Sequence, residues 1–185
     1  MPTRLLFVAA LMFSLTSYCY SSGQRFVVGL DRFYLNIVSD RIVIEKNGVE
    51  LLNKSVPDYS DGSIVISDFN FDGYPDFGLL RDSGIEKYFD VYVFNKNKQM
   101  YEVSEFLSSI PCPVVDAKRK IVSSTCNHGS ACENWQDHYE YKNSRFVLIR
   151  RDGVTCDPES GASYKYFEIF KSGRLIRNKT TRIKN

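Results

Sequence analysis

The sequence predicts an all-β protein, an antiparallel meander folded either as a β-sandwich or as a small propeller-like domain. Phe and Tyr are abundant, at 13 and 12 of the 185 residues, and Val and Ile recur in short runs, which is the composition of strands. Turn residues separate these runs at regular intervals, as in sandwiches and propellers. Helical periodicity is poor, and only the segment 103–110 is a candidate for a short helical turn.

Strand-like runs follow one another along the chain and alternate with polar turns. Asn47-Gly48 stands between two such runs and is the strongest short signal for a hairpin. The polar segments 95–98, 142–144 and 171–174 separate later pairs in the same way. The predicted strands are RFVVGL, RFYLNIV, RIVIEK, VELLNK, SIVIS, FGLL, FDVYVFN, QMYEVSE, KIVSSTC, ENWQDHYEY, RFVLIRR, SYKYFEIF and LIRNKTTRIK.

Residues 1–21 have the layout of a secretory signal peptide, and we expect 22–185 to form a single β-rich domain. Arg4 precedes the apolar run LLFVAALMFSL, and small and polar residues follow that run. The run is too short to span a membrane as a helix. Tyr18 stands where a lipoprotein signal needs a small residue, so ordinary cleavage is favoured over lipidation of Cys19.

The cysteine count agrees with export. Cys19 would leave with the signal peptide, and an even number of remaining cysteines in an exported chain predicts two disulfides. A metal site of Cys and His that includes His128 is the rival interpretation, but its spacing fits no established zinc pattern. The cysteines of the mature chain are Cys112, Cys126, Cys132 and Cys156.

The symmetry of the predicted hairpins favours one of the possible pairings of these cysteines. Cys112 and Cys126 lie symmetrically about the polar turn DAKR. Cys132 and Cys156 lie symmetrically, to within one residue, about the turn KNS. Cross-strand neighbours have the Cβ separation that a disulfide needs. We therefore predict one bridge across each of the two hairpins.

The stretch SDFNFDGYPDF predicts a calcium-binding loop similar to that of an EF-hand. Oxygens at its first, third and fifth positions can wrap a hard cation, the glycine at the sixth permits a sharp turn, the seventh offers a carbonyl and the ninth a carboxylate. Leu79 stands where an EF-hand has glutamate, and the flanks are strands, so the loop lies in a β context. A polar turn without metal is the alternative. The predicted calcium ligands are Asp68, Asn70, Asp72, the carbonyl of Tyr74, and Asp76.

The longer stretch DFNFDGYPDFGLLRDSGIEKYFDVYVFNKN resembles a group of bacterial periplasmic immunity proteins. These proteins neutralise peptidoglycan-cleaving effectors of an antibacterial type IV secretion system, and they are similar to periplasmic lysozyme inhibitors. The resemblance rests on the acidic loop, a short strand, a loop and a Tyr-rich strand that ends in FNKN. It implies a β-rich fold, a bound calcium ion, a periplasmic location, and a lysozyme-like peptidoglycan hydrolase as the protein partner.

The segment SGIEKY is similar to a loop of several classes of lysozyme inhibitor, in which Ser-Gly is closely followed by Tyr and enters the cleft of the enzyme. A hydroxyl or ammonium group between the two carboxylates of a glycosidase would occupy their hydrogen bonds and exclude substrate. The alternative is an ordinary hairpin loop, with its Tyr in the core or at an edge. The residues of the expected inhibitory loop are Ser83, Gly84, Lys87 and Tyr88.

Catalysis is not expected from this chain. His128 and His138 are its two histidines, and neither belongs to a recognisable nucleophile motif. A net charge of +2 gives no field that would suggest nucleic acid. The basic segment 174–184 is interpreted as a charged edge strand that resists edge-to-edge pairing, or as a contact for an acidic partner. The second functional hypothesis is a calcium-stabilised exported binding or adhesion module of unknown ligand.

Overall fold

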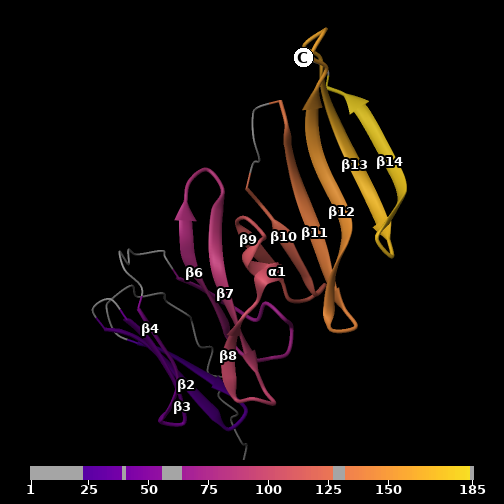
Figure 1. Cartoon of the computed structure of the whole chain (residues 1–185). Helices are drawn as coiled ribbons and strands as arrows, with labels where there is room; N and C mark the ends of the chain where they lie inside the picture. The colour runs from indigo at the N-terminus through magenta and orange to yellow at the C-terminus, as the bar shows by residue number, and fades with distance from the viewer. Residues whose placement is uncertain (1–22, 39–40, 56–63, 127–131, 184–185) are drawn as a thin grey trace, which may run out of the picture.

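The described part of the chain forms an all-β protein, as predicted (Figure 1). In the described residues, fourteen strands and one short helix are present, and in each of three antiparallel sheets every strand pairs with the next along the chain. The predicted signal peptide, Cys19 and His128 lie outside the described residues. The computed structural model describes residues 23–38, 41–55, 64–126 and 132–183.

The first two sheets are four-stranded meanders. The predicted hairpin at Asn47-Gly48 is confirmed, because Lys46 pairs with Val49 and both turn residues have positive φ, at 53° and 83°. The first sheet consists of β1 (Gln24–Val28), β2 (Asp31–Val38), β3 (Arg41–Lys46) and β4 (Val49–Ser55). The second consists of β5 (Ile64–Ser67), β6 (Asp76–Ser83), β7 (Lys87–Asn95) and β8 (Met100–Val103).

The third sheet has six strands and extends away from the other two (Figure 1). Its last four strands are longer than most of those that precede them. The basic C-terminal segment forms its edge strand, as the sequence predicted. The strands are β9 (Pro113–Asp116), β10 (Ile121–Ser124), β11 (Asn134–Lys142), β12 (Arg145–Cys156), β13 (Ser163–Lys171) and β14 (Arg174–Arg182).

The predicted helical turn is α1 (Glu105–Ser108), which joins the second and third sheets. Ser104 is its N-cap and accepts a hydrogen bond from the backbone N–H of Leu107, which is the usual way to satisfy a first-turn donor. The hydroxyl of Ser108 accepts a bond from the N–H of Val91 on β7 at 2.9 Å, so the helix is tied to the second sheet. No described helix is long and apolar enough to cross a membrane.

The second sheet is the middle layer of the molecule, because its two faces pack into two different core clusters. Tyr92 and Phe94 on β7 point into the first cluster, whereas Phe89 and Val91 point into the second, as expected from the alternation of side chains along a strand. The first cluster is completed mainly by β2 and β3, and the second by α1, β10 and the loop after β5. Each fully buried aromatic contributes roughly 1.5–3 kcal/mol. The first two sheets therefore form the sandwich that the sequence allowed.

The outer half of the third sheet has no covering layer. None of the residues in the described strands β12, β13 and β14 is buried, although β12 and β13 are paired on both edges. A central strand with one face in a core would contain buried residues at every second position. Apart from Phe146 at the start of β12, which packs against the second core cluster, the residues of these strands are at least partly exposed on both faces.

Candidate functional site

The predicted calcium loop is a tight turn between β5 and β6 whose acidic side chains bind backbone N–H groups. The carboxylate of Asp68 accepts bonds from the N–H groups of Asp72 at 2.9 Å and Gly73 at 2.8 Å. The amide oxygen of Asn70 also accepts from Asp72, at 3.1 Å, and the carboxylate of Asp72 accepts from Tyr74 at 2.9 Å. Gly73 has φ of +86°, a conformation that glycine adopts with little strain.

Asp76 is fully buried beneath this loop and accepts three backbone hydrogen bonds. One oxygen accepts from Phe69 at 2.9 Å and Asn70 at 3.2 Å, and the other accepts from Phe94 at 2.9 Å. Burial raises the pKa of this carboxyl from its ordinary value of 3.8 to about 7, although the backbone donors oppose the rise. The side chain ties the loop to β7, a structural role that the sequence did not predict.

Lys96 places a cation at the outside of the loop. Its ammonium donates a hydrogen bond to the carbonyl of Asp72, lies 3.8 Å from the carboxylate of the same residue, and lies 4.6 Å from the centre of the Tyr74 ring. The described residues contain no group of three or more His, Cys, Asp or Glu side chains arranged to hold a metal. The donors of the loop are all oxygens, and a carboxylate has roughly four acceptor positions, so their chemistry fits a hard cation such as calcium.

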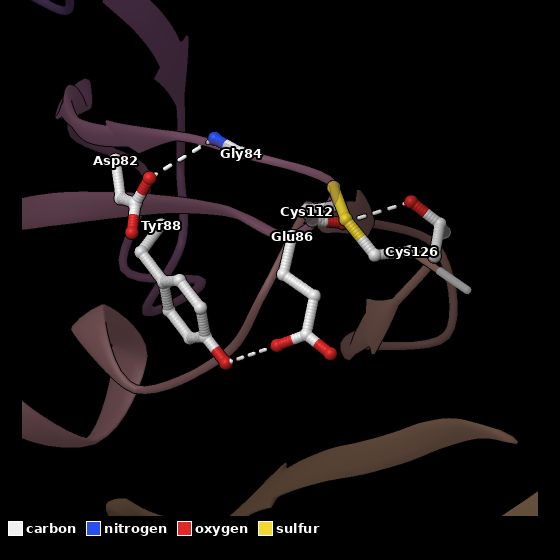
Figure 2. Close-up of a disulfide and its surroundings, with 7 residues drawn as sticks. Asp82, Gly84, Glu86, Tyr88, Cys112 and Cys126 are labelled. Carbon is white, nitrogen blue, oxygen red and sulfur yellow. Dashed lines mark hydrogen bonds between the residues drawn. A yellow bond between two sulfur atoms is a disulfide. The ribbon is translucent and has the colours of Figure 1, made fainter. Parts of the chain in front are cut away.

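The segment SGIEKY is the tip of the β6–β7 hairpin (Figure 2). Ser83 pairs with Lys87 where the hairpin closes, and both residues are exposed. The N–H of Gly84 donates to the carboxylate of Asp82 at 3.0 Å, which fixes the start of the turn. Ile85 is 84% exposed. An apolar side chain at the tip of a projecting hairpin is a candidate anchor for a partner, and although this residue lies within SGIEKY, no role was expected for it from the sequence.

Tyr88 is partly buried rather than projecting, because it lies on β7 below the tip. Its hydroxyl donates to the carboxylate of Glu86 at 2.6 Å (Figure 2). This hydrogen bond raises the pKa of Tyr88. The guanidinium of Arg81 lies 5.8 Å from the centre of its ring. Of the predicted loop residues, Ser83, Gly84 and Lys87 are exposed at the tip, whereas Tyr88 supports the tip from below.

The first predicted cysteine pair lies next to this hairpin. Cys112 and Cys126 are joined by a disulfide, with their Cα atoms 5.3 Å apart (Figure 2). The N–H of Cys112 donates to the carbonyl of Lys87 at 2.8 Å, and its carbonyl accepts from the N–H of Thr125 at 3.2 Å. The segment that contains the bridge is thus hydrogen-bonded to the first residue of β7.

The second predicted pair joins the open ends of β11 and β12. The Cα atoms of Cys132 and Cys156 are 5.0 Å apart. The register of this hairpin shifts between His138 and Tyr139, and such an irregularity adds one residue to one strand. The extra residue explains why Cys132 and Cys156 are symmetric about the turn KNS only to within one residue.

His138 is held between two partners on the third sheet. Its Nδ1 lies 2.8 Å from the hydroxyl of Ser123, and its Nε2 lies 3.2 Å from the carboxylate of Asp152. Asp152 also accepts two hydrogen bonds from the guanidinium of Arg150, at 2.5 and 2.6 Å, and these bonds lower its pKa. This is the arrangement expected of a hydrogen-bonded surface histidine.

Comparison with known proteins gives one informative match. No family model matches the chain, and no curated protein matches its sequence. A solved structure of a Xanthomonas type IV secretion system related protein is similar, with 19% sequence identity and a TM-score of 0.52. The likeness covers 89% of this chain and 94% of that chain. At this identity the match shows a shared fold: the chain has the fold of a protein related to a type IV secretion system.

Proposed function

We propose that the protein is an exported immunity protein that binds and blocks a lysozyme-like peptidoglycan hydrolase. The observation that carries this proposal is the projecting hairpin tip, on which Ser83, Ile85 and Lys87 are exposed. The fold shared with a type IV secretion system related protein supports it, because such systems deliver the effectors that the resembled immunity proteins neutralise. Two cysteine pairs at disulfide distance are compatible with export.

The hairpin tip has the size and chemistry to fill a glycosidase cleft. Only three residues, 84–86, separate β6 from β7, so the tip is narrow. The hydroxyl of Ser83 and the ammonium of Lys87 would take the hydrogen bonds of the catalytic carboxylates, and Ile85 would supply apolar contact at the centre of the interface. Tyr88 would hold the tip in shape through Glu86. A tip held in this way loses less entropy on docking.

The loop hypothesis predicts a loss of inhibition for single changes in the tip. Lys87→Ala and Tyr88→Ala should each weaken inhibition by about 2 kcal/mol, which is the scale of an interface hot spot and roughly a 30-fold rise in inhibition constant. The assay is turbidity clearing of cell walls by a purified lysozyme and by a hydrolase encoded beside this gene. Circular dichroism checks that each variant folds.

The controls separate direct contact from support. Arg145 lies at the β11–β12 turn, away from the tip, so Arg145→Ala should leave inhibition unchanged. Tyr88→Phe keeps the ring but cannot donate to Glu86, so it should lose less than Tyr88→Ala. If Lys87→Ala and Tyr88→Ala inhibit as well as the natural protein, the contact surface lies elsewhere. If no hydrolase is inhibited at micromolar concentrations, the inhibitor proposal fails.

We further propose that the loop between β5 and β6 holds calcium through the predicted ligands. Calcium should then stabilise the fold by about 1.4 kcal/mol when its concentration is ten times the dissociation constant. Calorimetry and thermal melts in calcium and in chelator measure this effect. Asp72→Ala should abolish both the heat and the melting shift, whereas Asp82→Ala at the hairpin tip should change neither. If the natural protein shows neither heat of calcium binding nor a shift in melting temperature, the calcium proposal is wrong.

A calcium-stabilised binding or adhesion module remains the second candidate function. The observation that favours it is the outer half of the third sheet, where no residue of β12, β13 or β14 is buried. Such a sheet is a large surface for a ligand. The inhibition assay decides between the two functions, because only the first requires that a hydrolase be blocked.

A further inference from the structure

The two faces of the third sheet can be told apart from its register. Val122 on β10 is buried in the second core cluster and pairs with Tyr139. The next residue, Ser123, pairs with His138 and lies on the opposite face, because side chains alternate along a strand. His138 therefore marks the face that points away from the core, which we name the outer face.

Cations are concentrated on the outer face. Three of its cross-strand rows hold four Lys or Arg residues, one carboxylate and one histidine. The rows, read from β11 to β14, are His138, Arg150, Ile169 and Arg177, then Gln136, Asp152, Phe167 and Lys179, and then Asn134, Val154, Lys165 and Thr181.

The inner face of the same strands has the opposite balance of charge. Its two matching rows hold one arginine against two carboxylates, and that arginine is bound to one of them at 2.6 Å. Strand pairing by itself does not require cations on one face, so the asymmetry indicates a contact with negative charge. The inner rows are Asp137, Arg151, Glu168 and Asn178, and Trp135, Gly153, Tyr166 and Thr180.

Phe167 lies at the centre of the outer face between two guanidinium groups. Arg150 lies 5.6 Å and Arg177 lies 5.7 Å from the centre of its ring. Lys165 and Lys179 line the same surface, which is hollowed into a groove of about 420 Å³. Aromatic residues and arginines are enriched at protein–protein interfaces. The planar guanidinium group of arginine also matches the geometry of a carboxylate.

We propose that the outer face of β11–β14 is a second docking surface, and that it binds an acidic protein segment. Carboxylates of the segment would pair with Lys165, Lys179 and Arg177, while an apolar or aromatic side chain packs on Phe167. A second copy of this face is a poor occupant, because it would place cations against cations. This surface is separate from the hairpin tip, so the proposal goes beyond the proposed function and does not depend on inhibition.

The test measures binding of a fluorescent peptide of alternating glutamate and tyrosine to the full mature protein. The double variant Lys165→Glu, Lys179→Glu should weaken binding about tenfold or more, because two attractive pairs become repulsive. The matched variant Lys142→Glu, Arg145→Glu makes the same change in net charge at the β11–β12 turn, outside the three rows. It should change affinity by less than about twofold.

Further measurements distinguish binding at this face from nonspecific electrostatic attraction. Phe167→Ala should also weaken binding, with a thermal melt to show that the variant is folded, and a peptide of alternating lysine and tyrosine should not bind. Equal losses in the two double variants would overturn the proposal, as would unaltered binding by Phe167→Ala. Binding of solubilised peptidoglycan without binding of the acidic peptide would overturn it too, because the ligand would then be a glycan. Dimerisation through this face in sedimentation would exclude it in favour of a second copy.

Discussion

Replacing Asp76 with alanine is expected to lower the free energy of unfolding by about 3–5 kcal/mol, because the change leaves two buried N–H groups and one partly buried N–H group without this acceptor. The donors belong to Phe69, Asn70 and Phe94, so the change releases the loop and its contact with β7 together. Urea unfolding followed by circular dichroism, in the presence of chelator, measures the loss without any contribution from a cation.

Two variants show whether the hydrogen bonds cause this effect. Asp76→Asn keeps one acceptor oxygen in nearly the same volume and should lose less stability than Asp76→Ala. Asp82→Ala removes a carboxylate that accepts a single backbone bond at the exposed hairpin tip, and it should fall within about 0.5 kcal/mol of the natural protein. A loss below about 1 kcal/mol for Asp76→Ala would show that the three bonds add little to stability.

Removing either disulfide is expected to lower stability by about 3 kcal/mol, because each bridge restricts the unfolded chain. The bridges close segments of 14 and 24 residues, so the chain-entropy model gives them similar values. The two double variants, Cys112→Ser with Cys126→Ser and Cys132→Ser with Cys156→Ser, can be compared by urea unfolding. A loss below about 1 kcal/mol for both pairs would contradict the entropic account.

The two bridges should differ in their effect on the hairpin tip, although they should contribute similarly to the stability of the protein. The backbone N–H of Cys112 donates to the carbonyl of Lys87, so loss of the first bridge should loosen the segment that makes this bond, and with it the tip. Amide hydrogen exchange of residues 83–88 should accelerate in the first double variant and stay unchanged in the second. Inhibition of a hydrolase should likewise weaken in the first double variant and stay unchanged in the second. Equal exchange in both variants would show that the bridge does not control the tip.

The fold was largely predictable because its signals are local. Alternating apolar residues and short polar turns give the strands, and Asn47-Gly48 gives its hairpin. The end of β12 was less visible, since the predicted strand ended at Arg151 but the observed one continues through Gly153 to Cys156. A Cβ at Gly153 would lie 2.4 Å from the ring of Tyr166. A contact between strands therefore explains that glycine, and the sequence alone does not display it.

The candidate site was predictable in its position but not in its bonding. The spacing of the acidic residues locates the loop, yet nothing local indicates that Asp76 accepts a bond from Phe94, which lies 18 residues further on. The same holds for Lys96, whose contact with Asp72 spans 24 residues. Ile85 lies within SGIEKY but had no expected role, and only its position on the folded hairpin shows that it is exposed.

The pairing of each strand with its successor also bears on how the chain folds. Every sheet is made of consecutive strands, so each pairing closes a short loop and incurs little chain entropy. Folds with such short sequence separations reach the native state faster than β-proteins with distant pairings. The first sheet can thus be completed without the strands of the last. We expect refolding from urea to be rapid, with any slow phase arising from the sandwich contact between the first two sheets.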